Sequence, residues 1–431
     1  MAGKKVTANH TVVNPNTFQT LRESWVSQFM IPLALIGPVE ITLRAIFTDT
    51  IRIFGHTLAV LAPLFLLGVA AGMWLINKQP ARPNRFLSSF ALLITALWLF
   101  VWVRETSGGL GYNFSIFVIV PAIWLIALKA PNFVDARRAA DFFISGLAIA
   151  AALGTILYLV GYPLSNQFAG ARPILGIVPN LFDHRWVGVF ETTTQASAVG
   201  AYLLIYGLWR RSWIFSVIAI FGVGILFTGY SRGALAAAAA ALMAALWFIP
   251  TVFGWNLSLL RRLLITISSI GVGSLLVLRS DPTMNGRTPI WDAYLTDLFP
   301  RSPVLGLGTP DLSNTIAADP QLSEIPAMSH AHNILLDGLA RYGLFGLIII
   351  LALLVFAAHL AIRAGRLGLW VGPSLMVALT VNQFTDVHID WRYLDYDYSV
   401  LIVAVVLSLA YTSKAQTPSR LPSGSSVNGT E

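Results

Sequence analysis

Residues 333–362 read NILLDGLARYGLFGLIIILALLVFAAHLAI, and this long apolar run decides the fold. A helix needs about 20 apolar residues to cross a hydrocarbon core of roughly 30 Å. The run is longer than one crossing requires, so we expect it to begin as a turn or two outside the bilayer. Gly338, Gly343 and Gly346 lie in its first half, where we expect them to allow a bend.

The composition of the whole chain agrees with a membrane protein. Of its 431 residues, 56% are hydrophobic and 11% are charged, whereas a soluble domain carries roughly 25% charged residues. Too little polar surface remains to coat a water-soluble globule, which excludes a cytosolic enzyme, a nucleic-acid binder and a disordered scaffold. The chain has no cysteine, so it forms no disulfide and no thiolate metal site. Its polar N-terminus shows no cleavable signal peptide.

Twelve stretches are apolar enough to cross a membrane, some of them only just. They are Val26–Leu43, Leu58–Ile76, Phe86–Val103, Phe114–Leu128, Phe142–Gly161, Val187–Trp209, Ser212–Gly229, Ala234–Phe253, Leu263–Leu278, Asn333–Ile362, Leu369–Thr385 and Val400–Tyr411. We therefore expect an all-α polytopic integral membrane protein, with residues 1–431 forming a single transmembrane domain of about 12 helices. The first stretch is the weakest, because Glu40 and Arg44 lie at its end, and a re-entrant or tilted helix is the alternative.

Basic residues sort the connecting loops into two alternating classes. The basic loops contain Lys78/Arg82/Arg85, Lys129/Arg137/Arg138, Arg210/Arg211, Arg261/Arg262 and Arg363/Arg366. Since basic loops stay on the cytoplasmic side, both termini are expected there, with residues 413–431 as a disordered cytoplasmic tail. The inner side then carries 17 Lys and Arg against four acids, and the outer side 11 against 16. The net charge of +8 is therefore mostly a sign of topology and does not indicate a nucleic-acid partner.

The long polar loops all fall on the outer side, where we expect the functional site. They are Tyr162–Trp186, Ser280–Ala331 and Asp386–Ser399. We expect the largest, residues 280–331, to contain a short amphipathic helix that starts with Thr288 as N-cap and Pro289 as its first residue. The apolar stripe suggests that this helix lies along the membrane surface, and it consists of Ile290, Tyr294 and Leu298, with Trp291 and Leu295.

Three arginines stand at outer helix starts, namely Arg185, Arg232 and Arg287. Ser231 can cap the helix that follows it, which would place Arg232 in the first turn. Free backbone N–H groups at such a turn bind anions, and a guanidinium strengthens the site. The alternative is that each arginine snorkels to lipid phosphates.

Two histidines, His330 and His332, end the large outer loop. Histidine can take up a proton near neutral pH, and at a helix start the dipole disfavours the imidazolium form, so His332 could act as a base. The alternative is a loop histidine that bonds to the backbone. No neighbouring residue completes a zinc site, so we expect no metal.

The last outer loop mixes aromatic rings with charged groups, among them Asp390, Trp391 and Arg392. Rings stack on the C–H faces of sugars and carboxylates accept hydroxyl protons, so the composition suits a glycan. An interfacial aromatic belt is an equally good explanation.

Several spacings resemble the O-antigen ligase and polymerase family. His332-Asn333, followed by Gly343 and Gly346, resembles the family signature. Three further blocks occur in the family's order, namely Arg185–Phe190, Ser231–Gly233 and the segment from Gly286-Arg287 through Trp291 to Arg301–Gly308. The resemblance covers roughly residues 185–346.

The resemblance implies a glycosyltransferase of the Gram-negative inner membrane, similar in fold to the class C glycosyltransferases and active on the periplasmic face. Such a ligase moves a glycan from undecaprenyl diphosphate to a hydroxyl of the lipid A core, with inversion and without a metal or cofactor. Arg185, Arg232 and Arg287 would bind the diphosphate, and His332 would be the general base. Secondary candidates are His330, Asn333, Tyr230, Ser231, Asp390, Trp391 and Arg392.

Two alternatives remain. An O-antigen polymerase would use a second lipid-linked repeat as acceptor, and we prefer the ligase because one substantial outer loop precedes His332. A twelve-span transporter would carry ionisable residues near the bilayer midplane and often internal repeats. Here the expected midplane positions are nearly free of charge, and the candidate groups gather at one face.

Overall fold

The computed structural model describes the following residues: 34–35, 37–39, 41–42, 84–105, 116–129, 131–160, 188–190, 192–229, 231–249, 251–252, 255–256, 287–325, 331–385 and 396–416. This part is helical, apart from a two-residue antiparallel pair between β1 (Thr251–Val252) and β2 (Trp255–Asn256). The expected all-α character is confirmed there. The expected spans Leu58–Ile76 and Leu263–Leu278 lie outside the described residues.

The apolar helices follow the predicted stretches. They are α3 (Arg85–Glu105), α4 (Ile116–Lys129), α5 (Phe133–Leu159), α6 (Thr193–Arg210), α7 (Trp213–Gly229), α8 (Arg232–Phe248), α13 (Ile334–Arg366), α14 (Val371–Thr385) and α15 (Tyr396–Gln416). Within the described ranges, four helices are long and apolar enough to cross a membrane, namely α3, α5, α13 and α15, while α7 and α8 are shorter apolar helices. The chain is thus a multi-pass membrane protein, and the total of about 12 spans stays a prediction.

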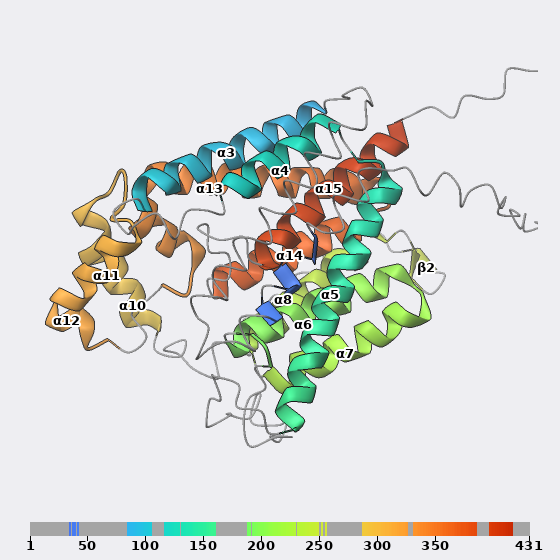
Figure 1. The fold of residues 1–431 in the computed structure, drawn as a ribbon, viewed down its shortest axis with the longest axis horizontal. Coiled ribbons are helices and arrows are strands. Elements are labelled where there is room, and N and C mark those ends of the chain that lie inside the picture. The colour runs from blue at the N-terminus through green and yellow to red at the C-terminus, as the bar shows by residue number, and fades with distance from the viewer. Residues whose placement is uncertain are drawn as a thin grey trace, which may run out of the picture.

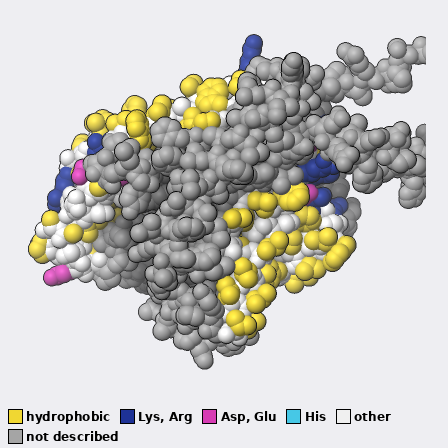
Figure 2. All heavy atoms as spheres, viewed as in Figure 1, with side chains coloured by type: hydrophobic (Ala, Val, Ile, Leu, Met, Phe, Trp, Pro, Cys, Tyr) yellow, Lys and Arg dark blue, Asp and Glu magenta, His cyan; other side chains and the backbone are white. Residues whose placement is uncertain are grey.

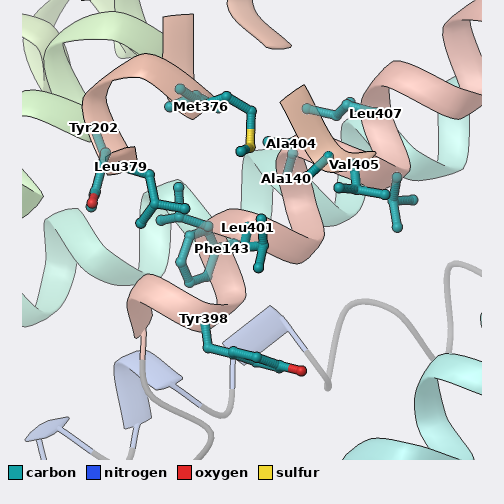
Figure 3. Packing of buried hydrophobic residues seen from close by; sticks show 14 of the residues in the cluster. Ala140, Phe143, Tyr202, Met376, Leu379, Tyr398, Leu401, Ala404, Val405 and Leu407 are labelled. Carbon is teal, nitrogen blue, oxygen red and sulfur yellow. The ribbon is translucent and has the colours of Figure 1, made fainter. Parts of the chain in front are cut away.

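The centre of the bundle forms around α15. Its side chains Leu401, Ala404 and Val405 are fully buried in the main core, and Figure 3 shows Leu401 beside Phe143 of α5. In contrast, apolar side chains cover much of the visible surface at the lower right, where Figure 1 places α7 (Figure 2). An apolar interior surrounded by an apolar exterior is the pattern expected of a bundle whose solvent is lipid.

A group of short helices lies at one end of the bundle (Figure 1). It consists of α10 (Arg287–Ala293), a π-helical turn η5 (Tyr294–Leu298), a 3-10 turn η6 (Phe299–Arg301), α11 (Thr309–Ala318) and α12 (Pro320–Ser323). We call these helices the outer cap.

Three side chains of the apolar stripe on α10 and η5 pack against protein, and whether this helix also lies along the membrane surface stays a prediction. Ile290, Tyr294 and Leu298 are at most 2% exposed and belong to a small core shared with Leu312 of α11 and Leu322 of α12. Helices α11 and α12 cover these three side chains, whereas Leu295 of the same stretch is 48% exposed. Helix α10 also includes Arg287, so Thr288 lies within the helix and is not the residue that precedes it.

Helix α13 breaks at Gly343, which confirms the predicted bend. Gly343 has φ 63° and ψ −169°, a conformation that glycine adopts readily and other residues do not. The break leaves carbonyls before it and N–H groups after it without helical partners. The segment 303–308 supplies them: the N–H groups of Leu307 and Gly308 donate to Ala340 and Arg341, both at 2.8 Å.

The same segment also provides hydrogen-bond acceptors for the N–H groups that follow the break. The carbonyls of Pro303 and Val304 accept from the N–H groups of Leu344 at 2.9 Å and Phe345 at 3.0 Å. Residues 303–308 therefore replace the missing helical turn and fix the outer cap to α13.

Candidate active site

Three motifs that are far apart in the sequence meet at the last residues of α14. Arg287 donates from its guanidinium to the carbonyl of Thr385. Asn333 donates from its side-chain amide to the carbonyl of Phe384 at 3.3 Å. Gly233 lies so close that a Cβ added there would approach the Thr385 hydroxyl to 2.3 Å. The end of α14 is therefore the common contact of the α8 start, the α10 start and the His332 turn.

The start of α8 follows the sequence expectation. Ser231 is the N-cap, and its hydroxyl accepts from the N–H of Ala234 at 3.3 Å. Arg232 is the first residue of the helix and is partly buried. First-turn N–H groups and a guanidinium together form a suitable place for an anion.

Arg287 contacts the end of α14 and also has the chemistry to bind an anion. Its donation to Thr385 places a cation at the C-terminal end of α14, where it complements the helix dipole. A guanidinium carries five N–H donors, more than the contact with Thr385 uses.

His332 precedes the N-cap of α13. Its backbone has φ 51°, in the left-handed region. Asn333 is the N-cap, and its side-chain oxygen accepts from the N–H groups of Leu335 at 2.9 Å and Leu336 at 3.3 Å. Asn333 therefore starts α13 and, through its amide, also fixes that start to α14.

The remaining candidates are Arg185, Tyr230, His330, Asp390, Trp391 and Arg392, and they lie outside the described residues. The end of the Arg185 motif is described: Val189 and Phe190 are buried. A Cβ added at Gly154 of α5 would lie 2.6 Å from the Val189 nitrogen. The motif thus ends against the C-terminal half of α5.

An ionic network supports the outer cap next to the site, and sequence reasoning missed it. Glu105, at the end of α3, accepts from the N–H of Thr309 at 3.0 Å and from its hydroxyl at 2.8 Å. Arg341 donates to the same hydroxyl at 2.9 Å and forms an ion pair with Asp337 at 2.7 Å. The spacing of Asp337 and Arg341, four residues apart on one helix, was the signal that could have revealed the pair.

The Tyr294 phenol lies within the electrostatic reach of this network. Burial raises its pKa well above the ordinary value, the Asp337 carboxylate raises the pKa further, and Arg341 lowers it by less. The phenol is therefore neutral at physiological pH and acts as part of the apolar core of the outer cap. Across the described ranges, no group of three or more His, Cys, Asp or Glu residues is placed to hold a metal ion.

The bundle of apolar helices defines a multi-pass membrane protein, and the candidate residues that the structure describes lie at one of its ends. A family model described as O-antigen ligase matches residues 195–351, which include Arg232, Arg287 and His332. The match supports the O-antigen ligase and polymerase family, and the resemblance predicted from the motifs is confirmed. No curated protein matches the sequence.

Proposed function

We propose that the protein is an O-antigen ligase of the Gram-negative inner membrane, with both termini in the cytoplasm. It transfers a polysaccharide from undecaprenyl diphosphate to a hydroxyl of the lipid A core on the periplasmic face. The observation that supports this proposal best is the gathering of the α8 start, the α10 start with Arg287, and the His332 turn around the end of α14. An inverting transfer needs both a diphosphate-binding group and a base, and this region offers both.

In the proposed reaction His332 accepts the proton of the acceptor hydroxyl. The freed oxygen forms the new glycosidic bond at the anomeric carbon of the donor sugar from the face opposite the leaving group. The bond between that carbon and the diphosphate breaks, and undecaprenyl diphosphate leaves with the electron pair. Arg232 and Arg287, with Arg185, stabilise the charge that develops on the diphosphate, a task that a cation performs in other transferases.

The experiment that tests this function offers the purified protein one lipid-linked donor and two acceptors in separate reactions. One acceptor is lipid A core and the other is a second lipid-linked repeat, both in buffer with a chelator. We expect glycan transfer to lipid A core, undiminished by the chelator, and no transfer by His332→Ala.

Other results would contradict the proposal in distinguishable ways. Elongation of the lipid-linked repeat alone would make the protein a polymerase. Uptake of a labelled solute into proteoliposomes without any glycan product would make it a transporter. Full transfer by His332→Ala would remove the assigned base while leaving the family intact.

A further inference from the structure

The backbone of His332 is held in an uncommon conformation. Among the described residues, His332 and Arg211 are the non-glycine residues with positive φ. Arg211 has an ordinary reason, because it is the C-cap of α6 and helices often end in a left-handed residue. His332 ends no helix. A left-handed residue of this kind persists only where its surroundings determine its backbone, and such residues concentrate at functional sites.

Hydrogen bonds to the backbone of Ala331 fix the conformation of the next residue, His332. Ala331 is fully buried, and its carbonyl accepts from the indole N–H of Trp291 at 2.8 Å. Its N–H donates to the Asp337 carboxylate at 3.4 Å. Both polar groups of the residue that precedes His332 are therefore fixed, one by the outer cap and one by α13.

The Asp337 carboxylate is itself fixed. One of its oxygens accepts a hydrogen bond from the Ala331 N–H, and the other lies 2.7 Å from the Arg341 guanidinium. Asp337 is 6% exposed, so water competes little for either contact. On the other side of His332, Asn333 is bound to α13 and to α14, so the turn is held from both ends.

We propose that Trp291 and Asp337 are positioning residues, which fix the Ala331 backbone and thereby aim the His332 imidazole at the acceptor hydroxyl. Neither residue needs to contact substrate. The inference rests on the proposed function, in which His332 is the base. The competing explanation is that Trp291 and Asp337 only stabilise the core of the outer cap.

The test compares Trp291→Phe, Asp337→Ala and Asp337→Asn with a control, Leu322→Ala. Phenylalanine keeps an aromatic ring but lacks the N–H, and asparagine keeps an oxygen acceptor for Ala331. Leu322→Ala weakens the same small core but removes no bond to Ala331. Initial rates are measured per folded protein with varied donor, and hydrogen exchange is followed at the amides of residues 332–336.

We expect kcat to fall roughly 10- to 100-fold in Trp291→Phe and Asp337→Ala, because small displacements of a catalytic group have effects of this size. The KM for the donor should stay within about twofold, since the arginines are untouched. Asp337→Asn should retain more of kcat than Asp337→Ala. Exchange at residues 332–336 should become faster in Trp291→Phe and Asp337→Ala and stay unchanged in Leu322→Ala.

Unchanged kcat in both Trp291→Phe and Asp337→Ala, while His332→Ala is inactive, would overturn the positioning role and leave the base assigned. An equal loss in Leu322→Ala would also overturn it, because core stability would then explain the effect. Full activity of His332→Ala would overturn the proposed base. If one variant does not fold, the other still decides, since each removes a different bond to Ala331.

Discussion

His332 illustrates how a single residue can cost stability where it serves function. A side chain with a Cβ is strained at φ 51°, whereas glycine is not. We predict that His332→Gly has a free energy of unfolding about 1 kcal/mol higher than that of His332→Ala. Both variants lack the imidazole and should be inactive, so the comparison isolates the backbone. Denaturant unfolding of the two proteins in the same detergent measures the difference, and an equal or more stable His332→Ala would contradict the strain.

The proposed binding of the donor diphosphate by Arg232 and Arg287 can also be tested by single substitutions. Lysine keeps the charge but loses the planar fork that binds a diphosphate through two parallel bonds. We predict that Arg232→Lys and Arg287→Lys each lower kcat/KM for the lipid-linked donor roughly tenfold or more. Steady-state rates with varied donor measure the effect.

Arg301→Lys is the matched control for the two arginine variants. Arg301 lies on the outer cap, as Arg287 does, but its side chain is 44% exposed and pairs with Asp319 at 3.1 Å. Exposed pairs of this kind contribute little, so its rate should stay within about twofold of the wild type. Unchanged rates in Arg232→Lys and Arg287→Lys would return both arginines to a role in binding lipid phosphates.

The sequence revealed residues that carry unusual chemistry and missed residues whose role depends on geometry. Arg232, Arg287 and His332 stand out because a basic group at an outer helix start is uncommon. Thr385 and Phe384 contribute only backbone carbonyls, and any residue type at those positions would offer the same groups. Contacts of that kind cannot be deduced from side-chain identity.

At the scale of elements, the break in α13 shows that a motif shared with a family can serve the fold and need not bind substrate. The glycine-rich block Arg301–Gly308 supported the family resemblance, and in the structure part of it fills the break at Gly343. A Cβ at Gly343 would meet the Val304 backbone at 2.4 Å, and a Cβ at Gly306 would meet the Arg341 backbone at 2.3 Å. Both glycines also have positive φ, so space and conformation both require glycine.

We predict that Gly343→Ala and Gly306→Ala each lower the free energy of unfolding by more than about 2 kcal/mol. Neither backbone contact can move without losing the bonds that bridge the break. Gly224→Ala, within α7, is the control, because nothing lies within 4 Å of its added Cβ. That variant should stay within about 1 kcal/mol of the wild type or gain stability. Thermal unfolding in detergent ranks the three, and a neutral Gly343→Ala would mean that the break does not depend on this glycine.

Apolar runs predicted the membrane-spanning parts of the helices accurately. They predicted less accurately where a helix begins in a polar segment. The apolar run placed the start of α5 at Phe142, but the helix begins at Phe133. Asn132 starts it, because its side-chain oxygen accepts from the Asp135 N–H at 2.9 Å and its amide donates to the Asp135 carboxylate at 2.7 Å. Hydropathy reports where lipid ends, whereas capping decides where the helix ends, and the two differ wherever a helix leaves the bilayer.

At the scale of the whole molecule, the basic helix ends gather on one side of the bundle. Arg210 at the end of α6 pairs with Asp141 of α5 at 2.5 Å. Lys414 near the end of α15 lies 5.7 Å from the ring centre of Phe133 at the start of α5. Helix α5 contacts both α6 and α15, so its first turns lie near both of these basic ends.

The opposite end of the bundle holds the outer cap and the candidate site. The end of α3 meets the cap there through Glu105 and Thr309, and the end of α14 meets the starts of α8 and α10. The sequence predicted two different ends from charge alone, and which end faces which side of the membrane stays a prediction. It could not predict that the outer loop folds into its own small core, because the stripe Ile290, Tyr294 and Leu298 has the same pattern whether lipid or protein covers it.

This two-ended arrangement predicts which residues face the periplasm. The chain has no cysteine, so a thiol reagent labels only a cysteine that is introduced for the test. Ser313, on α11 of the outer cap, and Ser413, near the end of α15, are both exposed, and serine to cysteine is a small change. We predict that a membrane-impermeant maleimide labels Ser313→Cys in intact spheroplasts, whereas Ser413→Cys is labelled only after permeabilisation. The cysteine-free protein sets the background, and retained glycan transfer shows that each variant is folded. Labelling of Ser413→Cys alone in intact spheroplasts would place the cap and His332 in the cytoplasm, where a periplasmic acceptor cannot reach them.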